Sequence, residues 1–270
     1  MSQPEATQQF EREIRAKVKA TPRGFVPRCR FGYHHGFSTM DPGVRHTMLA
    51  YYNERAAEYE EAYTRGTGTA SITDPSVFTN EISVLAGLVR GFGCGHLIDV
   101  ACGTGYWLPH YVGNCSHATL FDQSERMLAE CELKVRRLAV ADRCSLVRGD
   151  VFEYQFAPRA YDCALVGFLL SHLSEVQEHL VMQVLRNTLG PGACVLILES
   201  AWTDLRARFN QKVEWQTRRL NDGTEFQVYK RYISREDIGG WERKHGVRTT
   251  IEHFGEALCA VSATFTEVPA

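Results

Sequence analysis

Short apolar runs alternate with helical segments along the middle of this chain, and this alternation constrains the fold more than any other feature. The apolar runs lie at 96–100, 118–121, 145–147, 161–168 and 194–198. Apolar and polar side chains barely alternate within them, as expected for strands whose two faces are both covered by helices. The pattern therefore predicts an α/β fold with a doubly wound, mostly parallel sheet.

The segments on either side of this region do not show this regular alternation of strands and helices. The elements predicted there are a helix over 41–63, a helix starting at Asp74-Pro75, a helix over 204–220, a strand over 225–233, a helix over 235–245 and a hairpin of 249–254 with 257–264. Asn221-Asp222-Gly223 predicts a turn. An antiparallel hairpin is compatible with the end of a parallel sheet.

Composition and charge argue against several classes of protein. The net charge is −2, so nothing global points to a nucleic acid or a membrane as partner. The first residues carry acids and lack an apolar segment, which predicts no signal peptide and a cytoplasmic protein. The nine cysteines show neither C-x-x-C nor zinc-finger spacing, so we expect scattered free thiols and no metal site.

Residues 1–45 differ from the rest of the chain because basic and aromatic side chains are interleaved there. The aromatics include Phe25, Phe31, Tyr33 and Phe37. Such a segment can be a nucleic-acid-binding arm or a part that folds over the protein. We predict the second, since so many aromatics do not suit a freely solvated tail. The expected organisation is a helical and aromatic lid, 1–45, and a catalytic domain, 46–270.

Polar and glycine residues follow consecutive strands of the predicted sheet. The first strand ends at Asp99 and turns through Gly103 and Gly105 toward a helix. Glycines allow a ligand close to the backbone, and ligands bind outside the carboxyl ends of such strands. Asp122 follows the second strand, where an acid can accept from ribose hydroxyls, and Asp150 follows the third, where it can accept from an exocyclic amine. Together they predict a nucleoside-binding edge.

These segments resemble those of the class I S-adenosylmethionine-dependent methyltransferases. The matching pieces, in order, are LIDVACGTGYW, LFDQSERML, RGDVF, YDCALVGFLLSHL and LGPGACVLILE, and the helix AYYNERAAEYEEAY is similar to one that covers the cofactor in that family. The resemblance covers about residues 40–265. It implies a Rossmann-like, doubly wound, seven-stranded sheet, mostly parallel, with an antiparallel C-terminal hairpin.

The same resemblance implies roles for individual residues. Asp99, Gly103 and Gly105 would surround the methionine part of S-adenosylmethionine, Asp122 its ribose and Asp150 its adenine amino group. The other cofactor-binding residues expected are Tyr52, Tyr59, Ala101, Gln123, Met127, Val151 and Phe168.

Methyl transfer to a hydroxyl or a protonated amine benefits from a general base. His172 follows the fourth strand on the expected binding edge and is the candidate for that role. Candidates for contacts with the acceptor are Tyr33, His34, His35, Phe37 and Trp202.

The leading functional hypothesis is methyl transfer to an oxygen or nitrogen of a small molecule, in secondary metabolism, by a monomer or homodimer. One alternative is a non-methylating use of S-adenosylmethionine, such as its intramolecular cyclisation with release of methylthioadenosine. Another is a non-catalytic cofactor-binding protein. A nucleic-acid methyltransferase is disfavoured because GFLLSH stands where amino-methylating enzymes carry N-P-P-[YF].

Overall fold

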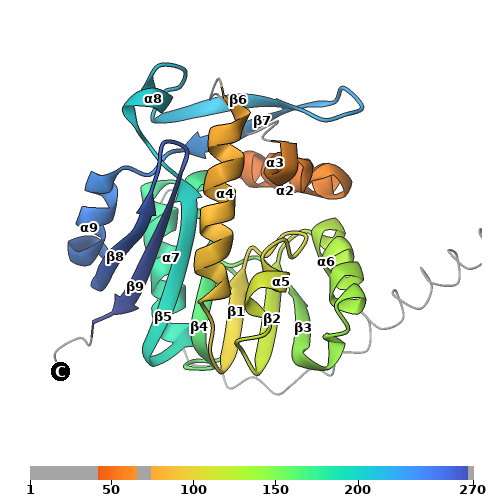
Figure 1. Cartoon of the computed structure of the whole chain (residues 1–270), viewed down its shortest axis with the longest axis vertical. Coiled ribbons are helices and arrows are strands. Elements are labelled where there is room, and N and C mark those ends of the chain that lie inside the picture. The colour runs from red at the N-terminus through yellow and green to blue at the C-terminus, as the bar shows by residue number, and fades with distance from the viewer. Residues whose placement is uncertain (1–41, 66–73, 267–270) are drawn as a thin grey trace, which may run out of the picture. The chain divides into compact units, whose positions relative to one another are not determined.

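A seven-stranded sheet forms the centre of the computed structural model, which describes residues 42–65 and 74–266 (Figure 1). Its strands are β1 His96–Val100, β2 His117–Asp122, β3 Cys144–Arg148, β4 Tyr161–Gly167, β5 Leu189–Ser200, β8 Val247–Phe254 and β9 Leu258–Phe265. Their order is β3-β2-β1-β4-β5-β9-β8. The pairs from β3 to β5 are parallel, whereas β9 pairs antiparallel with both β5 and β8. The predicted fold class and C-terminal hairpin are confirmed.

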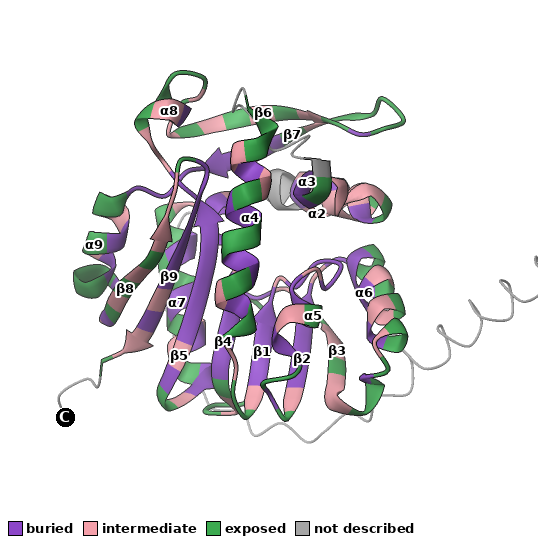
Figure 2. Cartoon of the chain, viewed as in Figure 1, coloured by how far each residue is buried: buried purple, intermediate pink, exposed green. Residues whose placement is uncertain are grey.

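Helices cover both faces of this sheet, which explains why the central strands β1, β2, β4 and β5 are buried along most of their length (Figure 2). One face packs against α4 (Pro75–Arg90), α5 (Leu108–Tyr111) and α6 (Glu125–Arg137). The other packs against α7 (Glu175–Thr188) and α9 (Arg235–His245). Neighbouring residues of β1 serve opposite layers: Leu97 belongs to the first core and Ile98 to the second.

The predicted helix over 41–63 is interrupted in the structure. It consists of α2 (Pro42–Arg55), a short 3-10 turn, η1 (Ala56–Glu58), and α3 (Glu61–Arg65). The other 3-10 turns are η2 (Ala141–Arg143) and η3 (Leu170–His172). Tyr52 lies in α2 and Tyr59 follows η1, and their ring centroids are 6.2 Å apart.

The predicted helix over 204–220 is wrong. The segment forms a four-residue helix, α8 (Asp204–Ala207), and then a strand, β6 (Val213–Arg219), which pairs antiparallel with β7 (Glu225–Arg231). Along β6, exposed and half-buried residues alternate, which is the period of a strand and not of a helix. The predicted turn at Asn221-Asp222-Gly223 joins the two strands.

The β6–β7 ribbon packs on α2 and lies apart from the main sheet (Figure 1). Met48 and Tyr51 of α2 form a small core with Val228 of β7 and Leu220. Cross-strand pairs share one face of a ribbon, so Gln216 faces the same way as its partner Val228. The half-buried side chains of β6 therefore point toward α2.

Two further observations concern the part of the chain that the structure describes. None of its helices is long and apolar enough to cross a membrane. Its cysteines, Cys94, Cys102, Cys115, Cys131, Cys144, Cys163, Cys194 and Cys259, are free thiols. The predicted lid, apart from the first residues of α2, lies outside the described residues.

Candidate active site

The turn after β1 is held in an unusual backbone conformation. Ala101, Gly103 and Gly105 have φ angles of 58°, 55° and 71°, in the left-handed region that glycine adopts without strain. Ala101 is not a glycine, so its conformation is costly, and such strain gathers at functional sites. The Cys102 amide donates to the Phe121 carbonyl at 3.1 Å, which ties the turn to the end of β2.

Asp122, the last residue of β2, organises the same turn. One carboxylate oxygen accepts from the Gly103 amide at 2.9 Å and the other from the Ser124 amide at 2.8 Å. Burial raises the pKa of Asp122 above its ordinary value, although these backbone hydrogen bonds oppose that shift. Each carboxylate oxygen has a further lone pair. Asp122 can therefore hold the glycine turn and still accept from a hydroxyl of a ligand.

Asp150 lies at the neighbouring strand end, after β3. Its side chain accepts from the Phe152 amide at 2.9 Å, which shapes the loop that carries Val151 and Phe152. Val151 and Phe152 contribute apolar surface beside this carboxylate in the same cavity. An acceptor next to apolar walls suits a flat heterocycle that carries an amino group.

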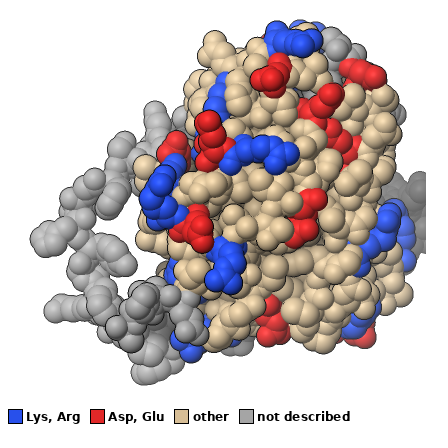
Figure 3. Space-filling view, turned by 60° about the vertical axis from the view of Figure 1, so that its left-hand side comes forward, with Lys and Arg blue, Asp and Glu red and all other residues tan. Residues whose placement is uncertain are grey.

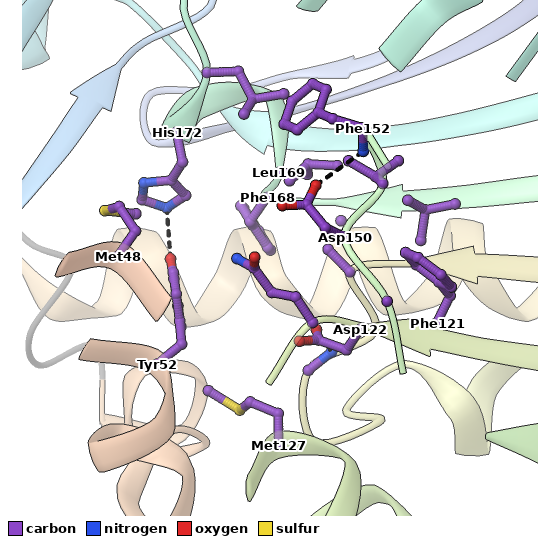
Figure 4. Close-up of a pocket in the computed structure, with 18 of the residues that line it drawn as sticks. Met48, Tyr52, Phe121, Asp122, Met127, Asp150, Phe152, Phe168, Leu169 and His172 are labelled. Carbon is purple, nitrogen blue, oxygen red and sulfur yellow. Dashed lines mark hydrogen bonds between the residues drawn. The ribbon is translucent and has the colours of Figure 1, made fainter. Parts of the chain in front are cut away.

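One cavity brings these strand ends together under α2 (Figure 4). It encloses about 940 Å³, open space at its mouth included. Its lining residues are Met48, Tyr52, Tyr59, Val100, Ala101, Gly103, Phe121, Asp122, Gln123, Met127, Gly149, Asp150, Val151, Phe152, Gly167, Phe168, Leu169, His172, Leu173 and Gln177. Carboxylates and apolar rings alternate around it, which fits a nucleoside with a charged tail.

A second cavity adjoins the first, on the side of the β6–β7 ribbon. It encloses about 620 Å³, open space included. Tyr52, Tyr59, Phe168 and His172 line both cavities and form the junction between them. Phe168 has a φ of 57°, another left-handed residue that is not glycine.

A hydrogen-bonded pair occupies this junction. The Tyr52 hydroxyl and His172 Nε2 are 2.8 Å apart, and His172 Nδ1 lies 2.8 Å from the Tyr229 carbonyl oxygen. A carbonyl only accepts, so Nδ1 carries the proton and Nε2 accepts from Tyr52. Burial, reinforced by Lys230, holds the pKa of His172 well below its ordinary value. The imidazole is therefore neutral near pH 7, as a proton acceptor must be.

Comparisons with known proteins agree with this architecture. A family model described as a methyltransferase domain matches residues 97–192, which include the glycine turn and the ends of β1 to β4. A DhpI–SAM–HEP complex superposes with a TM-score of 0.67 at 22% identity, over 83% of this chain and 99% of that one. At that identity the likeness concerns the fold.

Residues 97–192 are therefore similar to a methyltransferase domain, and the fold around them is shared with DhpI.

Curated relatives match a little over a third of the chain. The ubiquinone/menaquinone biosynthesis C-methyltransferase UbiE of Roseobacter denitrificans is 33% identical over 107 residues, 38% of this chain and 41% of that protein. The 2-phytyl-1,4-naphtoquinone methyltransferase of Synechococcus elongatus is 29% identical over 106 residues, 38% of this chain and 45% of that protein. This chain thus matches less than half the length of these relatives.

Most residues predicted for cofactor binding line the first cavity; Asp99 and Gly105 do not. Asp99 is buried beneath the glycine turn, accepts from the Tyr111 hydroxyl at 2.9 Å, and has its pKa raised to about 7 by burial. Gly105 packs so closely that a Cβ there would lie 2.7 Å from Cys131 Sγ. Both residues support the turn from behind the cavity wall.

Of the residues predicted to contact the acceptor, the structure describes Trp202. Trp202 stacks on Tyr232, with ring centroids 6.0 Å apart, and lines neither of the two cavities. Tyr33, His34, His35 and Phe37 lie outside the described residues. Within residues 42–65 and 74–266, no group of three or more His, Cys, Asp or Glu side chains is arranged to hold a metal ion.

Sequence reasoning missed the basic residues of the second cavity. Arg55, Arg206, Arg218 and Lys230 line it. The signal that could have found two of them is the alternation in 213–219, because a strand there places Arg218 and Lys230 on the inner face of a hairpin.

The neutral state of His172 should appear in the pH dependence of stability. The pKa of the folded imidazole is lowered, whereas an unfolded histidine titrates near ~6.5, so below that pH the unfolded chain binds more protons. The free energy of unfolding should therefore fall as the pH drops below about 6.5, by up to ~1.4 kcal/mol per pH unit from this residue. Urea unfolding of His172→Gln should show a shallower fall than the wild type between pH 7 and 5. Equal slopes would contradict the assignment.

Proposed function

We propose that this protein transfers a methyl group from S-adenosylmethionine to a small-molecule acceptor. The observation that carries the proposal is the pair of cavities that meet at Tyr52, Tyr59, Phe168 and His172. The first offers a carboxylate for ribose hydroxyls, a carboxylate for an adenine amine and apolar walls for a base. The second offers separate space for an acceptor. S-adenosylmethionine would supply an electrophilic methyl group on a sulfonium centre.

The residues of the first cavity fit this cofactor. Asp122 would accept from the ribose, Asp150 from the adenine, and the backbone of Gly103 would lie against the methionine part. Aromatic faces attract cations, and Tyr52, Tyr59 and Phe168 surround the junction where a sulfonium would lie. The DhpI structure that superposes on this chain is a complex with SAM, which supports the same choice of cofactor here.

We propose oxygen or nitrogen as the atom that is methylated. The neutral His172 and the Tyr52 hydroxyl lie at the junction. The acceptor hydroxyl or amine can give its proton to the Tyr52 oxygen while Tyr52 gives its own proton to His172 Nε2. The relative UbiE is named a C-methyltransferase. The choice of oxygen or nitrogen for this chain is therefore part of the proposal. We also propose that the protein acts in secondary metabolism and in the cytoplasm.

Calorimetry and product analysis test this function directly. The full chain should bind S-adenosylmethionine and S-adenosylhomocysteine, and incubation with small-molecule extracts should release S-adenosylhomocysteine with a methylated product. Mass spectrometry of both products is the measurement. Release of methylthioadenosine from the cofactor alone would instead support cyclisation, and binding without any product would support a non-catalytic role. Absence of binding would overturn the proposal.

A further inference from the structure

The second cavity gathers positive charge. Arg55 of α2, Arg206 of α8, Arg218 of β6 and Lys230 of β7 come from four elements and line one space. No acidic side chain is among the described residues that line it. On the face of the molecule in Figure 3, by contrast, Lys and Arg are interspersed with Asp and Glu. The concentration of positive charge is therefore a property of this cavity and not of the visible surface.

Arg206 is held rigidly with donor capacity left over. Its side chain is buried, with only 2% of the residue exposed. Nε donates to the Ala201 carbonyl at 2.8 Å and Nη2 to the Ala257 carbonyl at 2.7 Å. Nη1 is buried without a hydrogen-bond partner. The guanidinium also lies over the Tyr232 ring, 4.3 Å from its centroid, so these contacts fix a positive charge at the wall of the cavity.

Arg55 repeats this arrangement across the cavity. Its Nη1 donates to the Tyr51 hydroxyl, and its guanidinium lies 5.5 Å and 5.7 Å from the ring centroids of Tyr51 and Tyr59. Its Nε is buried without a hydrogen-bond partner. The aromatic rings hold the guanidinium in place without neutralising its charge.

The ribbon supplies the other two basic residues. Lys230 Nζ donates to Ser171 Oγ at 2.8 Å, and Arg218 Nη2 donates to Gln216 Oε1 at 2.5 Å. Glu199, buried behind the cavity wall, interacts electrostatically with Lys230, but its carboxylate also accepts from the Ser171 and Ser200 amides. Burial lowers the pKa of Lys230 to about 7, and Arg218 and Arg206 add to that effect while Glu199 opposes it. Glu81 interacts in the same way with Arg206, and it too lies outside the lining of the cavity.

We propose that this basic cavity binds an anionic group of the acceptor, a carboxylate or a phosphoryl group, and so holds the atom to be methylated at the junction with the first cavity. Guanidinium groups suit both anions because their planar donors match the oxygens of each. That the anion belongs to a methyl acceptor rests on the proposed function, whereas the binding of an anion in this cavity does not. A neutral quinone-like ring would bring no negative charge to these basic side chains.

The test measures binding of simple anions to the full chain by calorimetry at ~0.15 M salt, where contributions from the exposed surface are screened. Inorganic phosphate and benzoate are the probes, with S-adenosylhomocysteine present. We expect at least one of them to bind the wild type. Tighter binding of phosphate assigns a phosphoryl group, and tighter binding of benzoate assigns a carboxylate.

Two neighbouring arginines provide a matched pair of variants. Arg218 faces the cavity, whereas Arg219, the next residue of β6, is exposed and pairs with Glu225. Arg218→Met should weaken binding of the anion at least tenfold, and Arg219→Met should leave it nearly unchanged. Arg55→Met, on a different element, should also weaken binding. No binding to the wild type, or equal losses in Arg218→Met and Arg219→Met, would overturn the proposal.

S-adenosylhomocysteine affinity separates this proposal from the proposed function. Each variant should still bind S-adenosylhomocysteine as the wild type does, because the three substituted arginines do not line the first cavity. That result also shows that the variants fold. If the wild type binds an anion but no S-adenosylhomocysteine, the basic cavity stands and the proposed function fails.

Discussion

Asp122→Ala should weaken the binding of S-adenosylmethionine by at least ~100-fold. The substitution removes a carboxylate at the end of β2 that can accept from ribose hydroxyls. Hydrogen bonds to charged groups contribute about 1.5–3 kcal/mol each, and every ~1.4 kcal/mol is a factor of ten in affinity. The Gly103 and Ser124 amides, which donate to this carboxylate, also lose their partner, so the glycine turn loosens. Calorimetric titration with S-adenosylmethionine and S-adenosylhomocysteine is the measurement.

A nearby acid offers the matched control for this experiment. Glu125 begins α6, is exposed, and pairs with Arg148. Glu125→Ala should bind both ligands like the wild type, and thermal unfolding should show that Asp122→Ala remains folded at the temperature of the titration. Asp122→Asn keeps one oxygen acceptor and should lose less affinity than the alanine variant. Unchanged affinity in folded Asp122→Ala would remove the ribose assignment.

Gly105→Ala should lower the free energy of unfolding by about 2–5 kcal/mol. The φ of 71° places an alanine in the left-handed region, which costs ~1–2 kcal/mol. The new Cβ would also lie 2.7 Å from Cys131 Sγ, and overpacking of a core costs ~1–3 kcal/mol. The Gly113→Ala control meets no atom within 4 Å and should change stability by less than ~0.5 kcal/mol. Urea unfolding measures both.

A second substitution separates the two causes. Cys131→Ala removes the sulfur, and the next atoms near the new Cβ are then 3.7 Å and 3.8 Å away, which is ordinary contact. In the double variant, Gly105→Ala should therefore cost less than in the wild-type background, and the cost that remains is the backbone term. An equal cost in both backgrounds would show that the close contact has no part in the effect.

Local sequence was sufficient for the main sheet and for the strand ends that line the first cavity. Apolar runs that barely alternate require cover on both faces, so 96–198 was predictable as a parallel sheet. The acids and glycines at the strand ends were predictable as neighbours because parallel strands bring their carboxyl ends to one edge. Asp122 and Asp150 accordingly meet in one cavity. Asp99 and Gly105 carry the same local signal but do not line the cavity. Asp99 lies within β1 and its side chain is buried against Tyr111 of α5, and Gly105 packs against Cys131 of α6.

The second cavity was decided by tertiary structure alone. Its basic residues come from positions 55, 206, 218 and 230, and no spacing along the chain relates them. They meet because the β6–β7 ribbon packs on α2 and turns alternate side chains toward it. The helix predicted over 204–220 hid this arrangement, because a period of 3.6 residues assigns Gln216 and Arg218 to different faces, whereas a strand puts them on the same one. Sequence therefore predicted the acids and glycines that meet in the first cavity, and only the packing of the ribbon created the charged space beside it.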